Sequence, residues 1–246
     1  MAALFLLPAA VPAAPVAFVD MLGNPVSLAG PARRVVTLPM PAGSLMISLD
    51  GGVAHLAGMH PNAYTLMQGG LLARLFPALA QVRTDITRSG FAPNVETLLQ
   101  MQPDLVWQWG HMGDDLIAPL RNAGLPVAAL VYGTEARSRE WIRLMGLSLG
   151  QETRAAAQLA WRDQVRGEIA AVTDRLPADQ RPGVLYLARY APQLRASGAG
   201  TSFDDDIRLA GGRNVAAAIG SGQTINIEQI MAWAPDVILL NNFEPG

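Results

Sequence analysis

Short runs of β-branched and aliphatic residues alternate with amphipathic segments along most of the chain. Three of these runs predict strands, at residues 34–38, 105–109 and 127–131. Two amphipathic segments predict helices, at residues 44–57 and 116–123. Alternating strands and helices are typical of a parallel sheet with helices on its faces. The first part of the chain is therefore expected to form an α/β lobe.

A helical pattern with few breakers covers residues 135–176. Its second part, residues 152–176, predicts a helix of about 37 Å at ~1.5 Å per residue, longer than a typical globular helix. We interpret it as a rigid strut between two lobes. Pro177 and Pro182 follow the helical pattern, and a predicted strand at residues 184–188 opens a second lobe.

One sequence motif occurs twice. Asn94–Val106 and Asn226–Ile238 both begin with Asn-x-Glu, continue with apolar residues at helical spacing, reach Pro-Asp and enter a β-branched run. Asn suits a helix N-cap, Glu suits the first helical turn, and Pro ends the helix. Two distant copies do not make a solenoid, which needs many short repeats. They predict two α/β lobes of similar build.

The expected organisation follows from these elements. It comprises a signal segment at residues 1–17, an N-terminal lobe at 18–150, an inter-lobe helix at 151–176 and a C-terminal lobe at 177–246. Few residues follow the second motif copy, whereas helices and strands follow the first. The C-terminal lobe is therefore expected to be truncated, with the strand at residues 237–240 uncovered.

Residues 1–17 contain no charged side chain and are too short and rich in proline to span a bilayer. Val11-Pro12-Ala13 offers small residues for signal-peptide cleavage before Ala14, although no basic residue lies near Met1. The prediction is an export signal, and the alternative is a disordered apolar leader. The chain has no cysteine, which excludes disulfides, thiolate metal sites and a lipid-modified N-terminal cysteine.

Composition and motifs exclude several classes of function. Half of the residues are hydrophobic, 15% are charged and the net charge is -2, so a globular protein is expected and a nucleic-acid surface is not. The sequence lacks a nucleophile elbow, a zinc-binding helix motif and a phosphate loop. No catalytic residue and no protein-bound metal or cofactor are therefore predicted.

Loops after the predicted strands mix aromatic, methionine and hydrogen-bonding side chains. Such loops meet at one edge of a parallel sheet, which suits a large ligand that is partly apolar and partly anionic. The predicted ligand-binding residues are Met40, Ser44, His60, Trp109, His111, Met112, Tyr132, Arg189 and Tyr190. His60 is expected in a turn at residues 58–61, and His55 in the preceding helix. The simpler interpretations are that Trp107 or Trp109 belongs to the core and that Arg189 is an ordinary surface residue.

Glu96 and Glu228 occupy equivalent positions in the two motif copies. An acid in a first helical turn complements the helix dipole, and this effect alone can explain both residues. Their pairing allows a second interpretation, in which each lobe offers one carboxylate to a two-fold symmetric partner with two cationic sockets.

The order of elements, the two motif copies and the segment Leu209-Ala210-Gly211-Gly212-Arg213-Asn214 resemble periplasmic substrate-binding proteins of ABC importers for ferric siderophores, haem and cobalamin. The similarity runs from about Val19 to Leu240. It implies two Rossmann-like lobes with parallel sheets, joined by one long rigid helix. It also implies that Glu96 and Glu228 dock onto arginines of a permease dimer that works with ATPase subunits.

The resemblance further implies a monomer in the periplasm, or otherwise exported, with its ligand in the cleft between the lobes. The leading hypothesis is a non-enzymatic protein that captures an organic iron chelate. Arg189 would face acidic groups of the chelate, and Trp109 or Tyr190 its body. A rival ligand within this class is haem or cobalamin, distinguished by metal coordination through Tyr132, Tyr190, His60 or His111. Outside this class stand a metal-chelate enzyme, which the lack of cysteine disfavours, and a sensor or scaffold.

Overall fold

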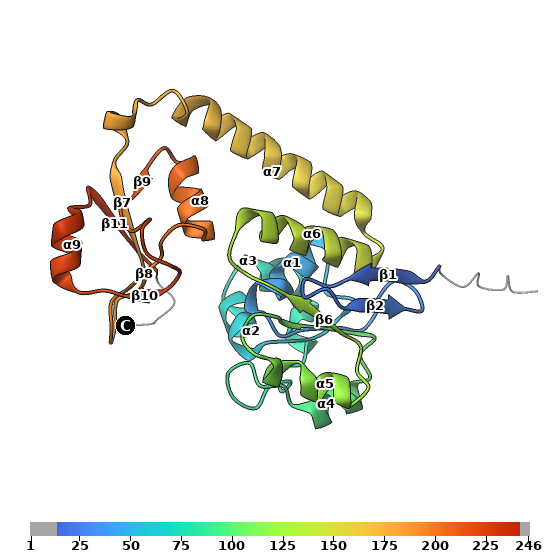
Figure 1. The fold of residues 1–246 in the computed structure, drawn as a ribbon. Helices are drawn as coiled ribbons and strands as arrows, with labels where there is room; N and C mark the ends of the chain where they lie inside the picture. Colours follow the sequence, from blue (N-terminus) through green and yellow to red (C-terminus); the bar gives the residue numbers. More distant parts are fainter. Residues whose placement is uncertain (1–13, 242–246) are drawn as a thin grey trace, which may run out of the picture. The chain divides into compact units, whose positions relative to one another are not determined.

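The computed structural model describes residues 14–241, and the chain divides into two compact units (Figure 1). The N-terminal unit comprises the residues up to Val131 together with Trp141–Ala156. The C-terminal unit comprises Tyr132–Glu140 and the residues from Ala157 onward. Most of the expected signal segment lies outside the described residues, but its last two residues, Val16 and Ala17, already belong to a strand. Across residues 14–241, no helix has both the length and the apolar character that a membrane span requires.

The N-terminal unit is built on a parallel sheet with the strand order β4-β3-β5-β6. The strands are β3 (Val35–Thr37), β4 (Leu56–Met59), β5 (Leu105–Trp109) and β6 (Val127–Leu130). An antiparallel hairpin, β1 (Val16–Val19) and β2 (Pro25–Leu28), adds to this unit. Every residue of β5 is buried, because this inner strand is covered on both faces.

Helices of the N-terminal unit connect these strands. They are α1 (Met40–Asp50), α2 (Pro61–Gln68), α3 (Leu71–Leu75), α4 (Val95–Met101) and α5 (Ala118–Asn122), with short 3-10 turns at Pro77–Gln81 and Asp114–Leu116. One apolar core joins the sheet to α4 and α5, and it includes Val36, Leu98, Val106, Ile117 and Leu120. The strands predicted at residues 34–38, 105–109 and 127–131 are confirmed within one or two residues.

The predicted helix at residues 44–57 is wrong at both ends. It begins at Met40 and stops at Asp50, because Gly51 adopts a left-handed φ of 72° and donates its N–H to Ile47. The segment after it is strand β4, which pairs with β3, so the turn expected at residues 58–61 is also wrong. His55 accordingly lies outside the helix, with its imidazole 3.0 Å from a carboxylate oxygen of Asp50.

The C-terminal unit has a mixed sheet with the order β10-β8-β7-β11, and β9 also pairs with β7. The strands are β7 (Gly183–Arg189), β8 (Arg195–Ala196), β9 (Arg213–Asn214), β10 (Gln223–Thr224) and β11 (Val237–Leu240). The helices that follow β8 and β10 are α8 (Ser202–Leu209) and α9 (Ile227–Trp233). The side chains of β11 are exposed, as predicted for residues 237–240, although β11 pairs in parallel with β7.

The helical stretch after residue 135 forms two helices, α6 (Glu135–Leu149) and α7 (Glu152–Thr173). Gly150, at a φ of 66°, separates them. Figure 1 shows α7 as one uninterrupted helix, which ends three residues before the predicted Leu176. A short 3-10 turn at Ala178–Gln180 follows.

Residues 132–140 group with the C-terminal unit, whereas the sequence assigns them to the N-terminal lobe. Polar contacts around Glu135 join this segment to α7 and α8. Its backbone N–H donates to Asp205 of α8 at 3.1 Å, and its carboxylate accepts from Arg162 Nε of α7 at 2.7 Å. The bound Arg162 guanidinium holds the pKa of the Glu135 carboxyl below its usual value.

The two motif copies form closely matching structures. Helices α4 and α9 each have seven residues, and each is capped by the asparagine that precedes it. Each also ends on a residue in the left-handed conformation, Gln102 at φ 48° and Ala234 at φ 42°. The predicted duplication is therefore present in the backbone as well as in the sequence.

The aspartate of each Pro-Asp pair binds the backbone of a neighbouring strand. Asp104 accepts the N–H groups of Arg33 at 2.6 Å and Arg34 at 3.0 Å, at the start of β3. Asp236 accepts the N–H of Gly183 at 2.6 Å, at the start of β7. Each aspartate thus accepts hydrogen bonds from backbone N–H groups at the start of a neighbouring strand. It thereby links its own strand to that neighbour at the edge of the sheet.

Replacing Asp104 by alanine is expected to lower the free energy of unfolding by about 1–3 kcal/mol, because two backbone donors lose a charged acceptor. Asp104→Asn keeps one acceptor oxygen and should lose less. Asp174→Ala, which removes an exposed carboxylate, is the control and should stay within about 0.5 kcal/mol of the parent chain. Urea unfolding measures all three, and equal stability of Asp104→Ala and the parent would contradict the prediction.

Candidate functional site

The carboxyl ends of the four parallel strands bring several predicted residues to one edge of the N-terminal sheet. Strand β3 leads into Met40, β4 into His60, and β5 into His111 and Met112. This edge is where ligands commonly bind in open α/β sheets. Met40, His111 and Met112 follow strands as predicted, whereas His60 follows β4, a strand that the sequence pattern did not predict.

Aromatic rings gather at this edge around Trp109. Its ring centroid lies 5.8 Å from that of Phe91, 5.1 Å from His111 and 5.5 Å from Trp141, and Phe91 in turn lies 4.7 Å from His60. We call these five residues the aromatic cluster. Edge-to-face and tilted contacts of this kind stabilise packed rings. Phe91 is half-buried and His111 is exposed, so these two members present the cluster to solvent.

Trp107 and Trp109 are both buried, with exposed fractions of 0% and 7%. The simpler interpretation, that one of the two belongs to the core, therefore holds for both. Residues two apart in a strand lie on the same face of the sheet, so both rings are buried on one covered face of β5. Trp107 stacks on Phe18 at 5.8 Å, whereas Trp109 supports the rings of the aromatic cluster.

His60 is only 3% exposed, and both of its ring nitrogens are engaged. Its Nδ1 accepts the N–H of Asn62 at 3.2 Å, so its Nε2 carries the proton and donates to the carbonyl of Gly90 at 3.0 Å. Burial lowers the pKa of the imidazole below its usual value, because it disfavours the charged form. His60 therefore caps α2 and supports Phe91 in this structure, and it presents no free lone pair for a metal.

Sequence reasoning missed Phe91, Trp141 and Gln108. Gln108 is fully buried, and its amide nitrogen donates to the carbonyls of Phe91 at 3.2 Å and Leu116 at 3.4 Å. It thereby holds the loop that carries Phe91 against β5. The indole N–H of Trp141 donates to the carbonyl of Val131 at 3.0 Å. Tryptophan is rare in this chain, with five in 246 residues, and this rarity could have drawn attention to Trp141.

The remaining predicted residues differ in their surroundings. The hydroxyl of Ser44 donates to the carbonyl of Pro41 within α1, at 3.0 Å. Tyr132 belongs to the C-terminal unit, where its hydroxyl lies 3.1 Å from the hydroxyl of Ser202. Arg189 ends β7 and Tyr190 follows it, and both are exposed. The predicted set is thus divided between the two units.

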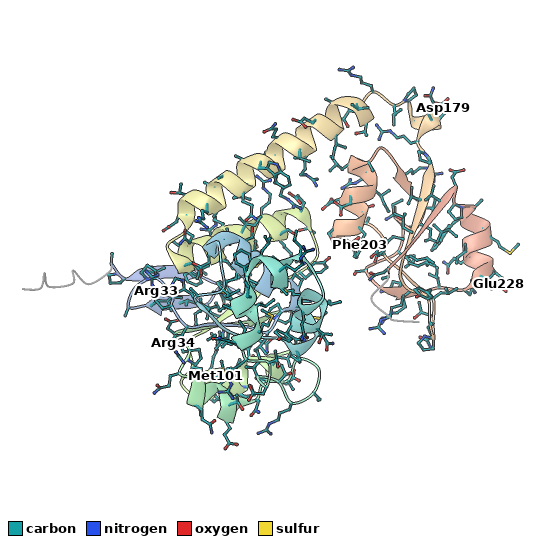
Figure 2. The ribbon with its side chains drawn as sticks, turned by 180° about the vertical axis from the view of Figure 1, so that it is seen from behind. Arg33, Arg34, Met101, Asp179, Phe203 and Glu228 are labelled. Carbon is teal, nitrogen blue, oxygen red and sulfur yellow. The ribbon has the colours of Figure 1, made fainter. Side chains whose placement is uncertain are left out.

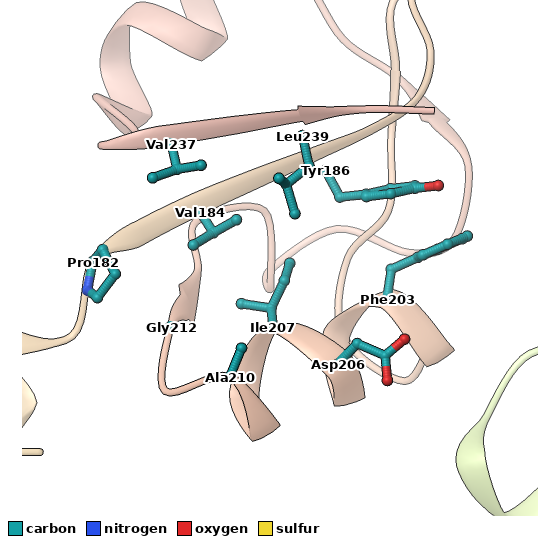
Figure 3. Close-up of a pocket in the computed structure, with 10 residues that line it drawn as sticks. All are labelled: Pro182, Val184, Tyr186, Phe203, Asp206, Ile207, Ala210, Gly212, Val237 and Leu239. Carbon is teal, nitrogen blue, oxygen red and sulfur yellow. The ribbon is translucent and has the colours of Figure 1, made fainter. Parts of the chain in front are cut away.

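A cavity of about 440 Å³ opens within the C-terminal unit, between α8 and one face of β7 and β11 (Figure 3). It is lined by Pro182, Val184, Tyr186, Phe203, Asp206, Ile207, Ala210, Gly212, Val237 and Leu239. Tyr186 stacks on Phe203 with a centroid distance of 3.8 Å, and burial raises the pKa of its hydroxyl to about 12. The residues predicted to bind ligand do not include any of these ten lining residues.

Metal ligands do not gather in the part of the chain that the structure describes. Among residues 14–241, no three or more His, Cys, Asp or Glu side chains lie close enough to hold a metal ion together. The two histidines at the sheet edge of the N-terminal unit are instead placed among aromatic rings.

Glu96 and Glu228 are both exposed, in the first turns of α4 and α9. Figure 2 labels Glu228 on α9. Neither carboxylate takes part in the ion pairs found within residues 14–241. Their exposure agrees with a surface role, and the assignment of that role to docking stays a prediction.

Comparison with known proteins identifies the family. Residues 87–243 match the model of the periplasmic binding protein family. The chain belongs to this family. The resemblance seen in the sequence and the two-lobed α/β fold class are thereby confirmed.

Three similar proteins place this periplasmic binding protein among its relatives. A cobalamin-binding protein of Halobacterium salinarum is 26% identical over 242 residues, covering 92% of this chain, and the chain spans 58% of that protein's length. The molybdate-binding protein MolA of Haemophilus influenzae is 24% identical, with 92% and 68% of the two chains covered. The crystal structure of a periplasmic solute binding protein from Veillonella parvula is 28% identical, with a TM-score of 0.76 over 93% of this chain and 69% of that one.

Proposed function

We propose that this periplasmic binding protein captures an organic metal complex outside the cytoplasm and delivers it to the permease of an ABC importer. A siderophore-type iron chelate is the first candidate ligand. The observation that carries the proposal is the aromatic cluster at the carboxyl edge of the N-terminal sheet. Rings of this kind bind the organic body of a ligand, whereas a bare hard cation requires several oxygen ligands. The protein's role in this proposal is binding, without catalysis.

Cobalamin is a second candidate, and the Halobacterium salinarum relative favours it, because that cobalamin-binding protein is similar over 92% of this chain. Haem is the other macrocycle of this class. The exposed imidazole of His111 is the histidine best placed to meet a metal centre, since His60 uses both ring nitrogens. A haem complex with His111 as ligand would show a Soret band shifted from that of unligated haem, and His111→Ala would lack this shift.

We propose Arg189 and Tyr190 as ligand-binding residues of the C-terminal unit. Arg189 ends β7 and is exposed, so its guanidinium is suited to the acidic groups of a chelate. Tyr190 adds an exposed ring beside it. Arg189→Ala should therefore weaken binding of an anionic chelate more than that of a neutral one.

The proposal is tested by titrating the chain with a ferric hydroxamate, a ferric catecholate, haem, cobalamin, molybdate and, under anaerobic conditions, ferrous ion without a chelating ligand. Trp109 and Trp141 belong to the aromatic cluster, so tryptophan fluorescence reports binding there. We expect micromolar or tighter affinity, about -8 kcal/mol or better, for at least one organic complex and none for the free ion.

Two variants test whether the ligand binds at the aromatic cluster. Phe91→Ala and His111→Ala should each weaken binding about tenfold or more, because each removes a ring that faces solvent in the aromatic cluster. Phe76→Ala removes a half-buried ring elsewhere in the same unit and is the matched control. Tight binding of molybdate or free ferrous ion alone would overturn the proposed ligand class, and unchanged affinity in both cluster variants would overturn the site.

A further inference from the structure

Gln108 interrupts the otherwise apolar strand β5, and its side chain is fully buried. Both ends of its amide group form hydrogen bonds. The side-chain oxygen accepts the N–H of Trp109 at 2.8 Å, and the nitrogen donates to the carbonyls of Phe91 and Leu116. An apolar residue would suit an inner strand of a parallel sheet without the cost of burying an amide. The hydrogen bonds of Gln108 therefore point to a role beyond packing.

The two carbonyls that Gln108 binds belong to separate loops. Phe91 lies in the loop before α4, and Leu116 ends the short 3-10 turn after the loop that carries His111. Phe91 and His111 are the two members of the aromatic cluster that reach solvent. One amide group thus links the two loops that carry the solvent-facing part of the cluster.

His60 holds the Phe91 loop at the neighbouring peptide. Its Nε2–H donates to the carbonyl of Gly90 at 3.0 Å, and its ring lies 4.7 Å from that of Phe91. His60 follows β4 and Gln108 belongs to β5, the strands on either side of β3 in the sheet. Two successive carbonyls of one loop are therefore held by buried side chains from two different strands.

We propose that Gln108 and His60 are positioning residues of the ligand site, which together fix Phe91 and His111 in their ligand-binding arrangement before the ligand arrives. The inference rests on the proposed function, because it takes the aromatic cluster to be the ligand site. Rings already held in place lose little conformational freedom when a ligand binds, so preorganisation raises affinity without an added contact. Both positioning residues are buried, and they act on the ligand through the rings.

Gln108→Met in the full chain tests the first of these residues. Methionine is similarly long and unbranched but donates no hydrogen bond, so both loops lose their shared donor. The probes are a ferric hydroxamate, a ferric catecholate, haem and cobalamin, titrated by tryptophan fluorescence. We expect those that bind the parent chain to bind Gln108→Met about tenfold more weakly. Without ligand, hydrogen exchange should be faster in peptides that cover residues 86–94 and 110–117, because these loops open more often.

His60→Asn tests the second positioning residue and keeps the helix cap. Asparagine is a good N-cap, so it can still accept the N–H of Asn62 at the start of α2, but its shorter side chain lacks the ring nitrogen that binds Gly90. Affinity for the same probes should fall about threefold or more. This variant decides the inference independently if Gln108→Met does not fold.

A double-mutant cycle with Phe91→Ala separates positioning from a general loss of structure. In a chain that already lacks the Phe91 ring, Gln108→Met should weaken binding about threefold or less, rather than tenfold, because only its effect on His111 remains. Asp104→Ala is the matched control. It destabilises the same unit at the start of β3, where Asp104 binds the backbone of Arg33 and Arg34, and it should bind the probes as the parent chain does.

Each other outcome overturns the inference. Parent-like affinity in Gln108→Met and His60→Asn would overturn it and leave the proposed function standing. A loss in Gln108→Met that multiplies fully with that of Phe91→Ala, or an equal loss in Asp104→Ala, would assign Gln108 to the fold alone. Failure of the parent chain to bind any of the four probes would overturn the proposed function, and the inference with it.

Discussion

Reversing both glutamates proposed to dock, with Glu96→Arg and Glu228→Arg in one chain, is expected to abolish ligand uptake through the proposed importer. Both side chains are exposed, and in the proposed docking each arginine would place a positive charge against a cationic socket of the permease. Like charges at both contacts oppose docking, whereas loss of one ion pair would only weaken it. Because neither residue belongs to the aromatic cluster, ligand affinity should stay within about twofold of the parent value.

The double variant should remain folded. A first-turn glutamate contributes roughly 0.3–1 kcal/mol through the helix dipole, so reversal of two costs little of a domain's stability. The control is Glu152→Arg, which reverses an exposed first-turn glutamate of α7. It should support uptake at the parent rate. Uptake is measured with the labelled ligand, and affinity by tryptophan fluorescence. Normal uptake by the double variant would contradict docking and leave Glu96 and Glu228 with helix stabilisation alone. A large loss of ligand affinity would instead mean that these residues bind ligand or only cap their helices.

Gly198→Ala is expected to destabilise the C-terminal unit severely, by about 3 kcal/mol or more. A Cβ at this position would overlap the carbonyl of Ile219 and lie 2.7 Å from the carbonyl oxygen of Ala216. Both obstacles are backbone, which cannot move aside as a flexible side chain would. The same loop is fixed by the Gly198 N–H, which donates to the carbonyl of Gly220 at 3.2 Å.

Gly167→Ala is a control that should stabilise the protein, whereas Gly198→Ala should destabilise it. Nothing lies within 4 Å of a Cβ at Gly167, which sits inside α7, so alanine should stabilise the helix by about 0.5–1 kcal/mol. Hydrogen exchange followed by mass spectrometry separates the units. In Gly198→Ala, peptides from β7, β8 and α8 should lose protection while those from β3 and β5 keep it. Parent-like protection of the C-terminal peptides would show that the loop relaxes without cost.

Local patterns were sufficient for much of the fold. The apolar runs that became β5 and β11 were bounded correctly, because each is a short run between clear breakers. Helices α4 and α9 were predicted from an asparagine cap, a first-turn glutamate and a following proline. The pattern failed at residues 51–59, where an apolar stretch after Gly51 suits a helix as well as a strand. Pairing with β3 decided that question, and a helical period cannot show that pairing.

The candidate site, like the fold, could be predicted only in part from the sequence. Sequence order was enough to show that His111 and Met112 follow a strand, but strand β4, which leads into His60, was not predicted. The parallel sheet brings all three residues to one edge. What each residue does at that edge depends on contacts from elsewhere in the chain. His60 uses both ring nitrogens on Gly90 and Asn62, and Phe91 joins the aromatic cluster from a separate loop.

Asp104 shows the same dependence, because its carboxylate binds the backbone of Arg33, 71 residues away. Local sequence determines the helices and strands, since capping residues and apolar periodicity act within a few residues. Burial and hydrogen-bond partners depend instead on which distant segments the fold brings into contact.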